Sequence, residues 1–382
     1  MIPVNEPKLN DEGLELLKDA YLSGWISSAG RYVDEFEDAW AQYCGAEYGI
    51  AVSNGTTALQ VAVEAVGVGQ GDEVIMPTYT IISCALAVVR AGATPVLVDC
   101  DPLTWCMNVE HIEGLITDRT KAIMVVHIFG HPVDMDPIMA LAAKYDLKVI
   151  EDAAEVHGAL YKSNRGTNKE VWKKCGGIGD ISTFSFFANK LITTGEGGMV
   201  VTNSVELAEK SKDLRNLCFR TDRRFLHTEL GYQFRFTNVQ AAIGLSQVRE
   251  IEEIVERKRW IAKEYSSRLQ HISQLQLPYE HDWARNVYWV YALVLGDEIP
   301  FDAKFFADKL RERGIETRPF FLGMHAQPAL TDLRFFEGES YPVTDRIASR
   351  GLYLPSGLAL TLDQIEDVAS AVVDILTPYV SA

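Results

Sequence analysis

The chain has 382 residues, 47% of them hydrophobic, and a formal net charge of −17 at pH 7. This length allows two or three domains around a large buried core. The negative charge argues against binding to nucleic acid or to an anionic membrane surface, because such partners repel an acidic chain. The N-terminus lacks the basic and apolar regions of a signal peptide, and no apolar run of about 18 residues occurs, so we expect a cytoplasmic protein without a membrane partner.

The cysteines and histidines show no metal-binding pattern. The six cysteines are scattered without Cys-x-x-Cys pairs, which favours reduced, mostly buried thiols. His127 and His131 have the i, i+4 spacing of a metal pair, but they follow a predicted strand, where helical spacing means little. We therefore expect no metal site.

Short β-branched runs alternate with helical patterns in the first half of the chain. The predicted strands cover residues 50–53, 73–76, 95–98, 122–126, 148–151, 182–186 and 199–202. The helical patterns between them cover residues 56–66, 81–91 and 137–145. This alternation predicts an α/β fold with a mainly parallel sheet, whose ligands bind at the carboxyl ends of the strands.

A different pattern begins near Asn238. A long helical pattern rich in charged residues runs to about residue 270, and a strand at 287–295 and helices at 303–313 and 362–375 follow. We therefore predict a large domain over residues 1–245 and a smaller α+β domain over residues 246–382. The polar, lysine-rich segment 161–179 is predicted to be a surface loop.

A small-residue turn joins the first predicted strand to the first predicted helix. Residues 53–57 (SNGTT) place two threonine hydroxyls at the start of the helix. Free N–H groups and the positive dipole end of a helix suit a phosphate group. A simple N-cap by Ser53 or Asn54 is the alternative interpretation.

An acidic segment (EDAAE, residues 151–155) ends the predicted strand at 148–151. Asp152 could stay ionised beneath a pyridinium nitrogen and keep that ring protonated as an electron sink. Opposite charges at hydrogen-bonding distance interact by roughly 4 kcal/mol at an effective dielectric of 20, which is enough to fix the protonation state. The alternative is a carboxylate that caps a helix.

Lys190 stands between aromatic residues and a glycine-rich turn at residues 194–198 (TGEGG). Loss of hydration there would lower the pKa of its amine from about 10.4 toward neutrality. A neutral amine is what Schiff-base formation requires. The alternative is a solvated surface lysine, which is the commonest situation for this residue type.

In their order and spacing, these segments resemble the DegT/DnrJ/EryC1/StrS sugar aminotransferase family, a branch of the aspartate-aminotransferase fold (type I). The resemblance covers nearly the whole chain. It includes residues 25–28 (WISS), 54–59 (NGTTAL), 71–77 (GDEVIMP), 92–96 (GATPV), 151–154 (EDAA), 194–198 (TGEGG) and 237–244 (TNVQAAIG). It implies a large domain with a seven-stranded, mainly parallel sheet that binds pyridoxal 5'-phosphate (PLP), and a smaller C-terminal domain.

The resemblance also implies roles for single residues. Lys190 would bind PLP as a Schiff base, and Asp152 would pair with the pyridinium nitrogen. The phosphate would be held by Gly55, Thr56, Thr57 and Ser185.

Three further positions complete the cofactor site that the resemblance implies. Asn238 would reach the phosphate from a second subunit, which implies a homodimer with shared active sites. Glu155 takes the place of a glutamine or histidine near the phenolic oxygen of the cofactor. Ile81 stands where many relatives stack an aromatic ring on the cofactor, so an aliphatic side chain or Tyr79 would cover it here.

Candidate substrate contacts follow partly from charge and partly from the resemblance. Arg223 and Arg224 belong to a basic cluster in an acidic chain, and guanidinium groups match the oxygens of a nucleotide diphosphate. The alternative is a solvated loop paired to nearby acids. Trp25 and His325 are further substrate candidates, the latter because relatives approach the sugar there.

The activity that the resemblance implies is amino transfer from L-glutamate to C4 of a nucleotide-linked 4-keto-6-deoxyhexose. The motifs at 25–28, 151–155 and 193–198 are most similar to those of members that convert GDP-4-keto-6-deoxymannose to GDP-perosamine, a precursor of O-antigen and lipopolysaccharide. Amination of dTDP-4-keto-6-deoxyglucose to dTDP-viosamine is the nearest alternative. A PLP-dependent sugar dehydratase, in which relatives replace the lysine by histidine, and a non-catalytic regulatory protein are the others.

Overall fold

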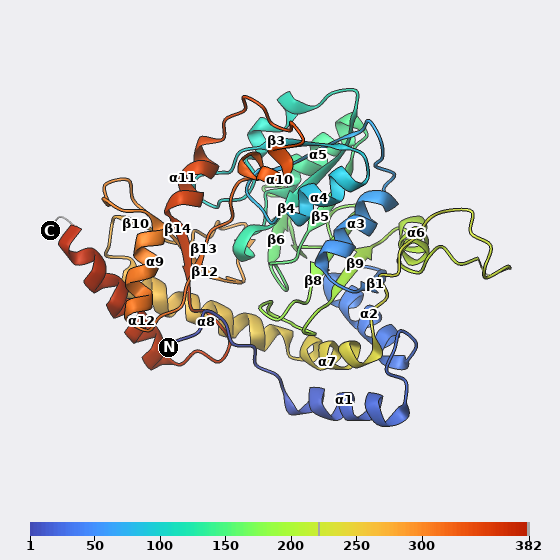
Figure 1. The fold of residues 1–382 in the computed structure, drawn as a ribbon, viewed down its shortest axis with the longest axis horizontal. Coiled ribbons are helices and arrows are strands. Elements are labelled where there is room, and N and C mark those ends of the chain that lie inside the picture. The colour runs from blue at the N-terminus through green and yellow to red at the C-terminus, as the bar shows by residue number, and fades with distance from the viewer. Residues whose placement is uncertain (221, 380–382) are drawn as a thin grey trace.

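The computed structural model describes residues 1–220 and 222–379 (Figure 1). Its central feature is a seven-stranded sheet in the order β1-β9-β8-β5-β4-β2-β3. The strands are β1 (Tyr48–Val52), β2 (Glu73–Pro77), β3 (Thr94–Val98), β4 (Thr120–Val126), β5 (Lys148–Asp152), β8 (Ile181–Ser185) and β9 (Gly198–Thr202). Strands β2, β3, β4, β5 and β8 are parallel, whereas β9 runs antiparallel to both of its neighbours. The predicted mainly parallel sheet is confirmed.

Helices cover this sheet. Every residue of β2 and of β9 is buried, and because successive side chains point to opposite faces, both faces of the sheet are covered. The helices of this part are α2 (Arg31–Cys44), α3 (Gly55–Ala65), α4 (Ser83–Arg90), α5 (Met135–Tyr145) and α6 (Val205–Arg215). The α3, α4 and α5 positions agree with the helical patterns of the sequence within a few residues.

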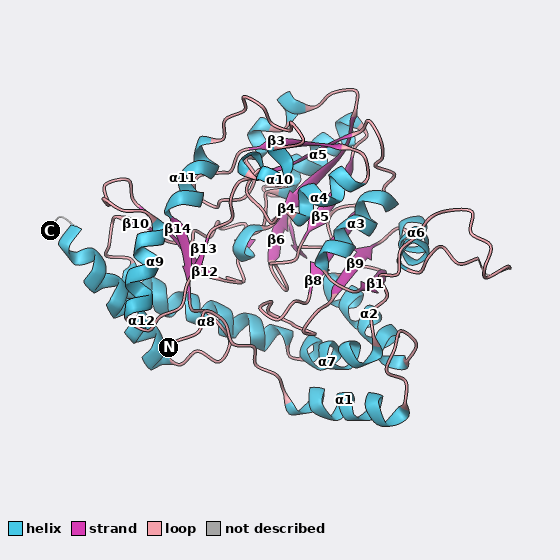
Figure 2. Cartoon of the chain, in the orientation of Figure 1, coloured by secondary structure: helices cyan, strands magenta, loops and turns pink. Residues whose placement is uncertain are grey.

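The segment 161–179 differs from the predicted loop. It forms a hairpin of β6 (Leu160–Ser163, labelled in Figure 2) and β7 (Val171–Lys174), which β11 (Ala284–Arg285) extends to a three-stranded sheet. A strand was not predicted here because β7 (VWKK) is mostly exposed and does not alternate apolar with polar residues, which is the pattern by which strands are recognised. The tip of the hairpin, between the two strands, is mostly exposed.

A second unit follows the long helical segment, which is divided at Glu250 into α7 (Asn238–Arg249) and α8 (Ile251–Leu269). Its four-stranded sheet has the order β10 (Leu275–Gln276), β12 (Tyr291–Leu295), β14 (Gly351–Leu354) and β13 (Arg318–Pro319). Its helices are α9 (Ala303–Glu312), α10 (Pro328–Thr331), α11 (Pro342–Arg350) and α12 (Leu362–Leu376). A separate apolar cluster that includes Tyr265, Phe306 and Leu352 forms its core.

Helix α8 runs from below the large sheet toward the smaller one (Figure 1). The predicted domain boundary between residues 245 and 246 falls inside α7, and the division into two domains stays a prediction. The N-terminal residues lie beside the second unit, where Ile2 N donates to Gly314 O over 2.7 Å. From there the chain crosses to α1 (Asp11–Ser23), which packs on α7. None of the described helices has the length and apolar character that crossing a membrane requires.

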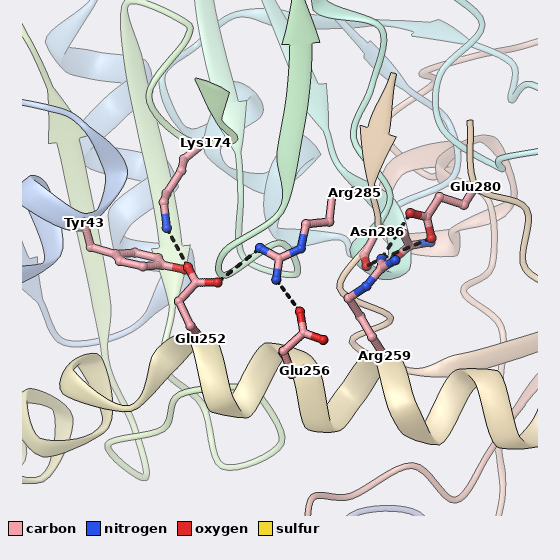
Figure 3. Close-up of polar contacts among 8 residues, drawn as sticks. All are labelled: Tyr43, Lys174, Glu252, Glu256, Arg259, Glu280, Arg285 and Asn286. Atoms are coloured by element: carbon pink, nitrogen blue, oxygen red, sulfur yellow. Dashed lines mark hydrogen bonds and ion pairs between the residues drawn. The ribbon is translucent and has the colours of Figure 1, made fainter. Parts of the chain in front are cut away.

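A cluster of ion pairs joins the β6–β7 hairpin and β11 to α8 (Figure 3). Glu252 of α8 accepts hydrogen bonds from Tyr43 Oη at 2.7 Å, from Lys174 Nζ at 2.9 Å and from Arg285 at 3.1 Å. Arg285 also donates to Glu256 over 2.6 Å. These contacts join α2, β7, β11 and α8, which are distant in the sequence.

Candidate active site

Lys190 follows β8 and lies in a largely buried position. Its side chain is 10% exposed, its Nζ lies 3.7 Å from the centre of the Trp289 ring, and Glu155 Oε1 is 3.9 Å away. Burial lowers the pKa of Lys190, because a charged ammonium loses hydration there. The sequence-based expectation of a desolvated lysine therefore agrees with its surroundings.

Asp152 is the last residue of β5, at the carboxyl end of the sheet. Its Oδ1 accepts from Ala154 N over 3.1 Å, and its Oδ2 accepts from the thiol of Cys84 over 3.1 Å. Burial raises the pKa of Asp152, whereas the hydrogen bond from Cys84 lowers it. The carboxylate is thus fixed in orientation by one donor on each oxygen.

Glu155 supplies a second buried carboxyl group near Lys190. Its Oε2 accepts from Phe129 N over 2.7 Å. Burial raises the pKa of Glu155 to about 7, although the nearby Lys190 acts in the opposite direction. This group of buried side chains thus contains one amine and two acids.

The start of α3 forms a second feature of the site. Asn54 Oδ1 accepts from Thr57 N over 2.9 Å, and Thr57 Oγ1 accepts from Asn54 N over 3.2 Å, which makes a reciprocal cap. Asn54 is therefore an N-cap, as one of the two interpretations predicted. The N–H groups of Gly55 and Thr56, which precede Thr57 in the helix, have no partner within the helix, so they are available to an anion.

Gly55 brings this helix start against β8. A Cβ atom at Gly55 would lie 2.8 Å from Ser185 Cβ, so a larger residue would require one of the two segments to move. Thr56 Oγ1 forms a 2.8 Å hydrogen bond with Ser83 Oγ. Hydroxyl groups and main-chain donors thus gather where the sequence predicts a phosphate.

Helix α4 connects these two features through adjacent residues. Ser83 bonds to Thr56 at the start of α3, while Cys84 bonds to Asp152 at the end of β5. The start of α3 and the acidic end of β5 are therefore neighbours. This arrangement suits a ligand that carries a phosphate at one end and a protonated nitrogen at the other.

The chain was compared with known proteins. The profile of the DegT/DnrJ/EryC1/StrS aminotransferase family matches residues 7–373. The chain is 40% identical to the GDP-perosamine synthase of Caulobacter vibrioides, over 98% of both chains. It is 40% identical to the GDP-perosamine synthase of Escherichia coli O157:H7, over 95% of both chains. The chain belongs to the DegT/DnrJ/EryC1/StrS aminotransferase family.

Solved structures agree with this membership. The aminotransferase TlmJ from Streptoalloteichus hindustanus superposes with a TM-score of 0.90 at 29% identity and covers 99% of both chains. DesV of S. venezuelae, solved with a ketimine intermediate, superposes with a TM-score of 0.87 at 30% identity, over 97% of this chain and 99% of DesV. The chain is thus a PLP-dependent sugar aminotransferase with the predicted type I fold.

The pocket has the donor set that PLP requires. A lysine of lowered pKa can be the neutral amine that reacts with the aldehyde, and a buried carboxylate can pair with the pyridinium nitrogen. The close approach of Gly55 to Ser185 brings main-chain and hydroxyl donors together at the position that the sequence predicts for the phosphate. The residues present therefore fit the cofactor.

Asn238 lies apart from this group. Its Oδ1 accepts from Tyr32 N over 2.9 Å, and its Nδ2 donates to Trp25 O over 2.6 Å. With Gly30 and Arg31, these residues line a separate pocket. None of the hydrogen bonds that Asn238 makes among the described residues reaches Lys190.

The remaining predicted site residues are Ile81, His325, Arg223 and Arg224. Ile81 precedes α4 and is 42% exposed. His325 bonds through Nδ1 to Thr78 Oγ1 at 2.9 Å and through Nε2 to Asp345 Oδ1 at 2.8 Å. Arg223 and Arg224 are exposed on the segment after α6, and within residues 1–220 and 222–379 no carboxylate pairs with either of them. The alternative interpretation, in which these two arginines pair with nearby acids, is therefore not found among the described residues.

The structure adds three residues that the sequence analysis missed. Cys84 contacts Asp152, Trp289 contacts Lys190, and Phe129 contacts Glu155. Cys84 was predicted only to be a buried thiol. No local signal marks the other two, because Phe129 lies 26 residues from Glu155 in the chain and Trp289 lies 99 residues from Lys190.

Proposed function

We propose that the protein transfers the amino group of L-glutamate to C4 of a nucleotide-linked 4-keto-6-deoxyhexose, with GDP-4-keto-6-deoxymannose as the acceptor and GDP-perosamine as the product. The observation that carries the proposal is the buried Lys190 between Asp152 and Glu155 in a chain so similar to two GDP-perosamine synthases. A retained lysine favours transamination over dehydration, in which relatives carry histidine at this place.

Within this proposal, Lys190 Nζ holds the cofactor and moves a proton at the substrate carbon. Asp152 keeps the pyridine nitrogen protonated. The phosphate is held by Gly55, Thr56, Thr57 and Ser185. When bound, PLP supplies an electron sink that stabilises negative charge on the carbon that loses its proton. Burial of the lysine supports its role, since only a neutral amine can accept that proton.

We assign recognition of the sugar nucleotide to the margin of the pocket. Arg223 and Arg224 supply positive charge for a diphosphate, and their lack of a paired acid within residues 1–220 and 222–379 leaves them available. His325 is oriented by Thr78 and Asp345, which suits a hydrogen bond to a sugar hydroxyl. Trp25 is largely exposed and offers a flat apolar surface.

The active unit in this proposal is a cytoplasmic homodimer with two shared active sites. Asn238 would contact the cofactor phosphate of the second subunit, which agrees with its side chain bonding to Tyr32 and Trp25 in its own chain and not to Lys190. Exposed apolar side chains on α1, among them Tyr21 and Leu22, provide surface for such a contact. The product would serve surface polysaccharide synthesis, such as the O-antigen of lipopolysaccharide.

The test is a turnover panel with L-glutamate as the donor. Each candidate acceptor is added to the PLP-loaded protein, and amino-sugar formation is followed by mass spectrometry. We expect the highest kcat/KM with GDP-4-keto-6-deoxymannose. A higher value with dTDP-4-keto-6-deoxyglucose would select the viosamine alternative. A deoxy sugar with release of ammonia would show a dehydratase, and turnover of neither ketosugar would overturn the proposal.

A further inference from the structure

We propose that Glu155 is the proton partner of Lys190: when Nζ is free, a proton passes between the Lys190 ammonium and Glu155 Oε1. The transfer converts an ammonium and a carboxylate into a neutral amine and a neutral carboxylic acid, so that charge and protons balance. This inference rests on the proposed role of Lys190. It assigns to Glu155 an action on the lysine in addition to its place near the cofactor.

One of the two carboxylate oxygens of Glu155 is held by a hydrogen bond, and the other faces Lys190. Its Oε2 accepts the N–H of Phe129, while Oε1 lies 3.9 Å from Lys190 Nζ. A small shift of the flexible lysine chain, or one water molecule, suffices for proton transfer over this gap. The geometry thus leaves the second oxygen of Glu155 for the amine.

The donor to Glu155 is held in an uncommon backbone conformation. Phe129 has φ 54°, in the left-handed region, which costs an aromatic residue free energy and persists only where surrounding contacts enforce it. The Phe129 ring packs 4.9 Å from the Phe320 ring and 6.0 Å from the Tyr79 ring, measured between centres. The fold therefore keeps a strained residue whose N–H orients Glu155.

Asp152 does not compete for this role. Both of its oxygens already accept hydrogen bonds, from Ala154 N and from Cys84 Sγ. Among the described residues, Glu155 is the carboxylate within 4.0 Å of Lys190 Nζ. In this proposal, Asp152 therefore acts on the cofactor and Glu155 acts on Lys190.

The other titratable groups that face this pair are uncharged near neutral pH. They are Tyr79, Cys84, Cys106, His157 and Tyr353. Burial raises the pKa of each of these tyrosines and cysteines, and it lowers the pKa of His157 to about 3. Of the described groups that face Lys190 and Glu155, this leaves Asp152 beside the pair itself to carry charge, and the pKa of Glu155 near 7 suits proton exchange at neutral pH.

The test compares the PLP-loaded wild type with Glu155→Gln. The amide oxygen of glutamine can still accept the Phe129 N–H, so the local fold should be retained; far-ultraviolet circular dichroism checks this. Two quantities are measured against pH: the absorbance of the bound cofactor, and the rate of the half-reaction with L-glutamate. Glu155→Asp keeps a titrating carboxyl group, and Glu37→Gln removes a different buried carboxyl group, one that pairs with Arg215.

We expect both pH transitions of Glu155→Gln to move to lower pH by about one unit or more, because loss of a negative neighbour disfavours positive charge at Nζ. The plateau rate should fall about tenfold or more, since the proton acceptor is absent. Glu155→Asp should keep its transitions near those of the wild type, and Glu37→Gln should not move them.

Different results would overturn the proton pairing of Glu155 with Lys190 and the proposed function. Unmoved transitions in Glu155→Gln, with the cofactor absorbance intact, would overturn the proton pairing alone, and a slower rate would then be a structural effect. A wild-type protein that develops no cofactor absorbance with added PLP would overturn the proposed function together with this inference.

Discussion

The thiol of Cys84 donates a hydrogen bond to Asp152 Oδ2 across 3.1 Å, at a place where both side chains are buried. Burial raises the pKa of Cys84 well above its usual value, so the sulfur keeps its proton and remains a donor. The bond opposes the effect of burial on Asp152, whose pKa would otherwise rise further. Cys84 therefore helps to keep the proposed partner of the cofactor nitrogen ionised.

The first prediction concerns this bond. Cys84→Ala should raise the dissociation constant of PLP by about three- to tenfold, because a donor to a buried charged group is lost. Cys84→Ser keeps a hydroxyl donor and should stay within about twofold of the wild type. Equilibrium titration of the cofactor-free protein with PLP, followed by absorbance, gives both constants. Equal weakening in the two variants would show that the size of the sulfur matters and not its proton.

The second prediction concerns Lys190. Lys190→Ala should abolish multiple turnover, a loss of at least about 10³-fold, and remove the absorbance that covalent attachment of PLP produces. Its circular dichroism spectrum and elution volume should match those of the wild type. Lys148→Ala removes a half-exposed lysine at the start of β5 and is the matched control, with activity retained. Multiple turnover by Lys190→Ala would contradict the assignment of this residue.

The third prediction concerns the two exposed arginines after α6. The double variant Arg223→Ala/Arg224→Ala should raise the KM of the sugar nucleotide by about tenfold or more while leaving that of L-glutamate unchanged, because only the former has a diphosphate. Arg220→Ala is the control, since Arg220 already pairs with Asp222 over 2.8 Å. Steady-state kinetics with both substrates varied gives the comparison. An unchanged KM for the sugar nucleotide would place its diphosphate elsewhere.

Local patterns predicted much of the large sheet. The β-branched runs that became β2, β4 and β5 are buried on both faces, so their apolar character is continuous and easily recognised. The long charged helix was also predicted, but its interruption at Glu250 was not, because that residue is compatible with a helix and only its backbone angles differ (φ −106°, ψ 9°). The hairpin was missed because its second strand (VWKK) is mostly exposed and does not alternate apolar with polar residues.

The residues of the candidate site also fall into two groups: some were predicted from local motifs, and others come together only through tertiary packing. Asp152 and Lys190 stand in motifs at the ends of strands, so their spacing along the chain was informative. Trp289 reaches Lys190 from the second unit, and no local pattern connects positions 190 and 289. The partners of Asn238 in its own chain depend on how α1, α2 and α7 pack, which is a tertiary property.

The last prediction concerns the ion-pair cluster in Figure 3. Burial acts to raise the pKa of Glu252, but the hydrogen bonds from Lys174, Tyr43 and Arg285 outweigh it and lower the pKa to about 2. The folded pKa thus lies below that of the unfolded chain, which is about 4.3. The contribution of Glu252 to stability is therefore complete above about pH 5 and is lost as the pH falls toward about 2.

Because the side chain of Glu252 is 53% exposed, solvent screening reduces its contribution to about 1 kcal/mol at neutral pH. Glu252→Gln should lower the stability by about this amount at pH 7 and by roughly half as much at pH 3. Glu256→Gln is the matched control, because Glu256 pairs with Arg285 alone among the described residues and is 66% exposed. Urea unfolding followed by circular dichroism at a series of pH values measures the difference. If Glu252→Gln destabilises the protein equally at pH 7 and pH 3, shape and not charge makes Glu252 important for holding the hairpin to α8.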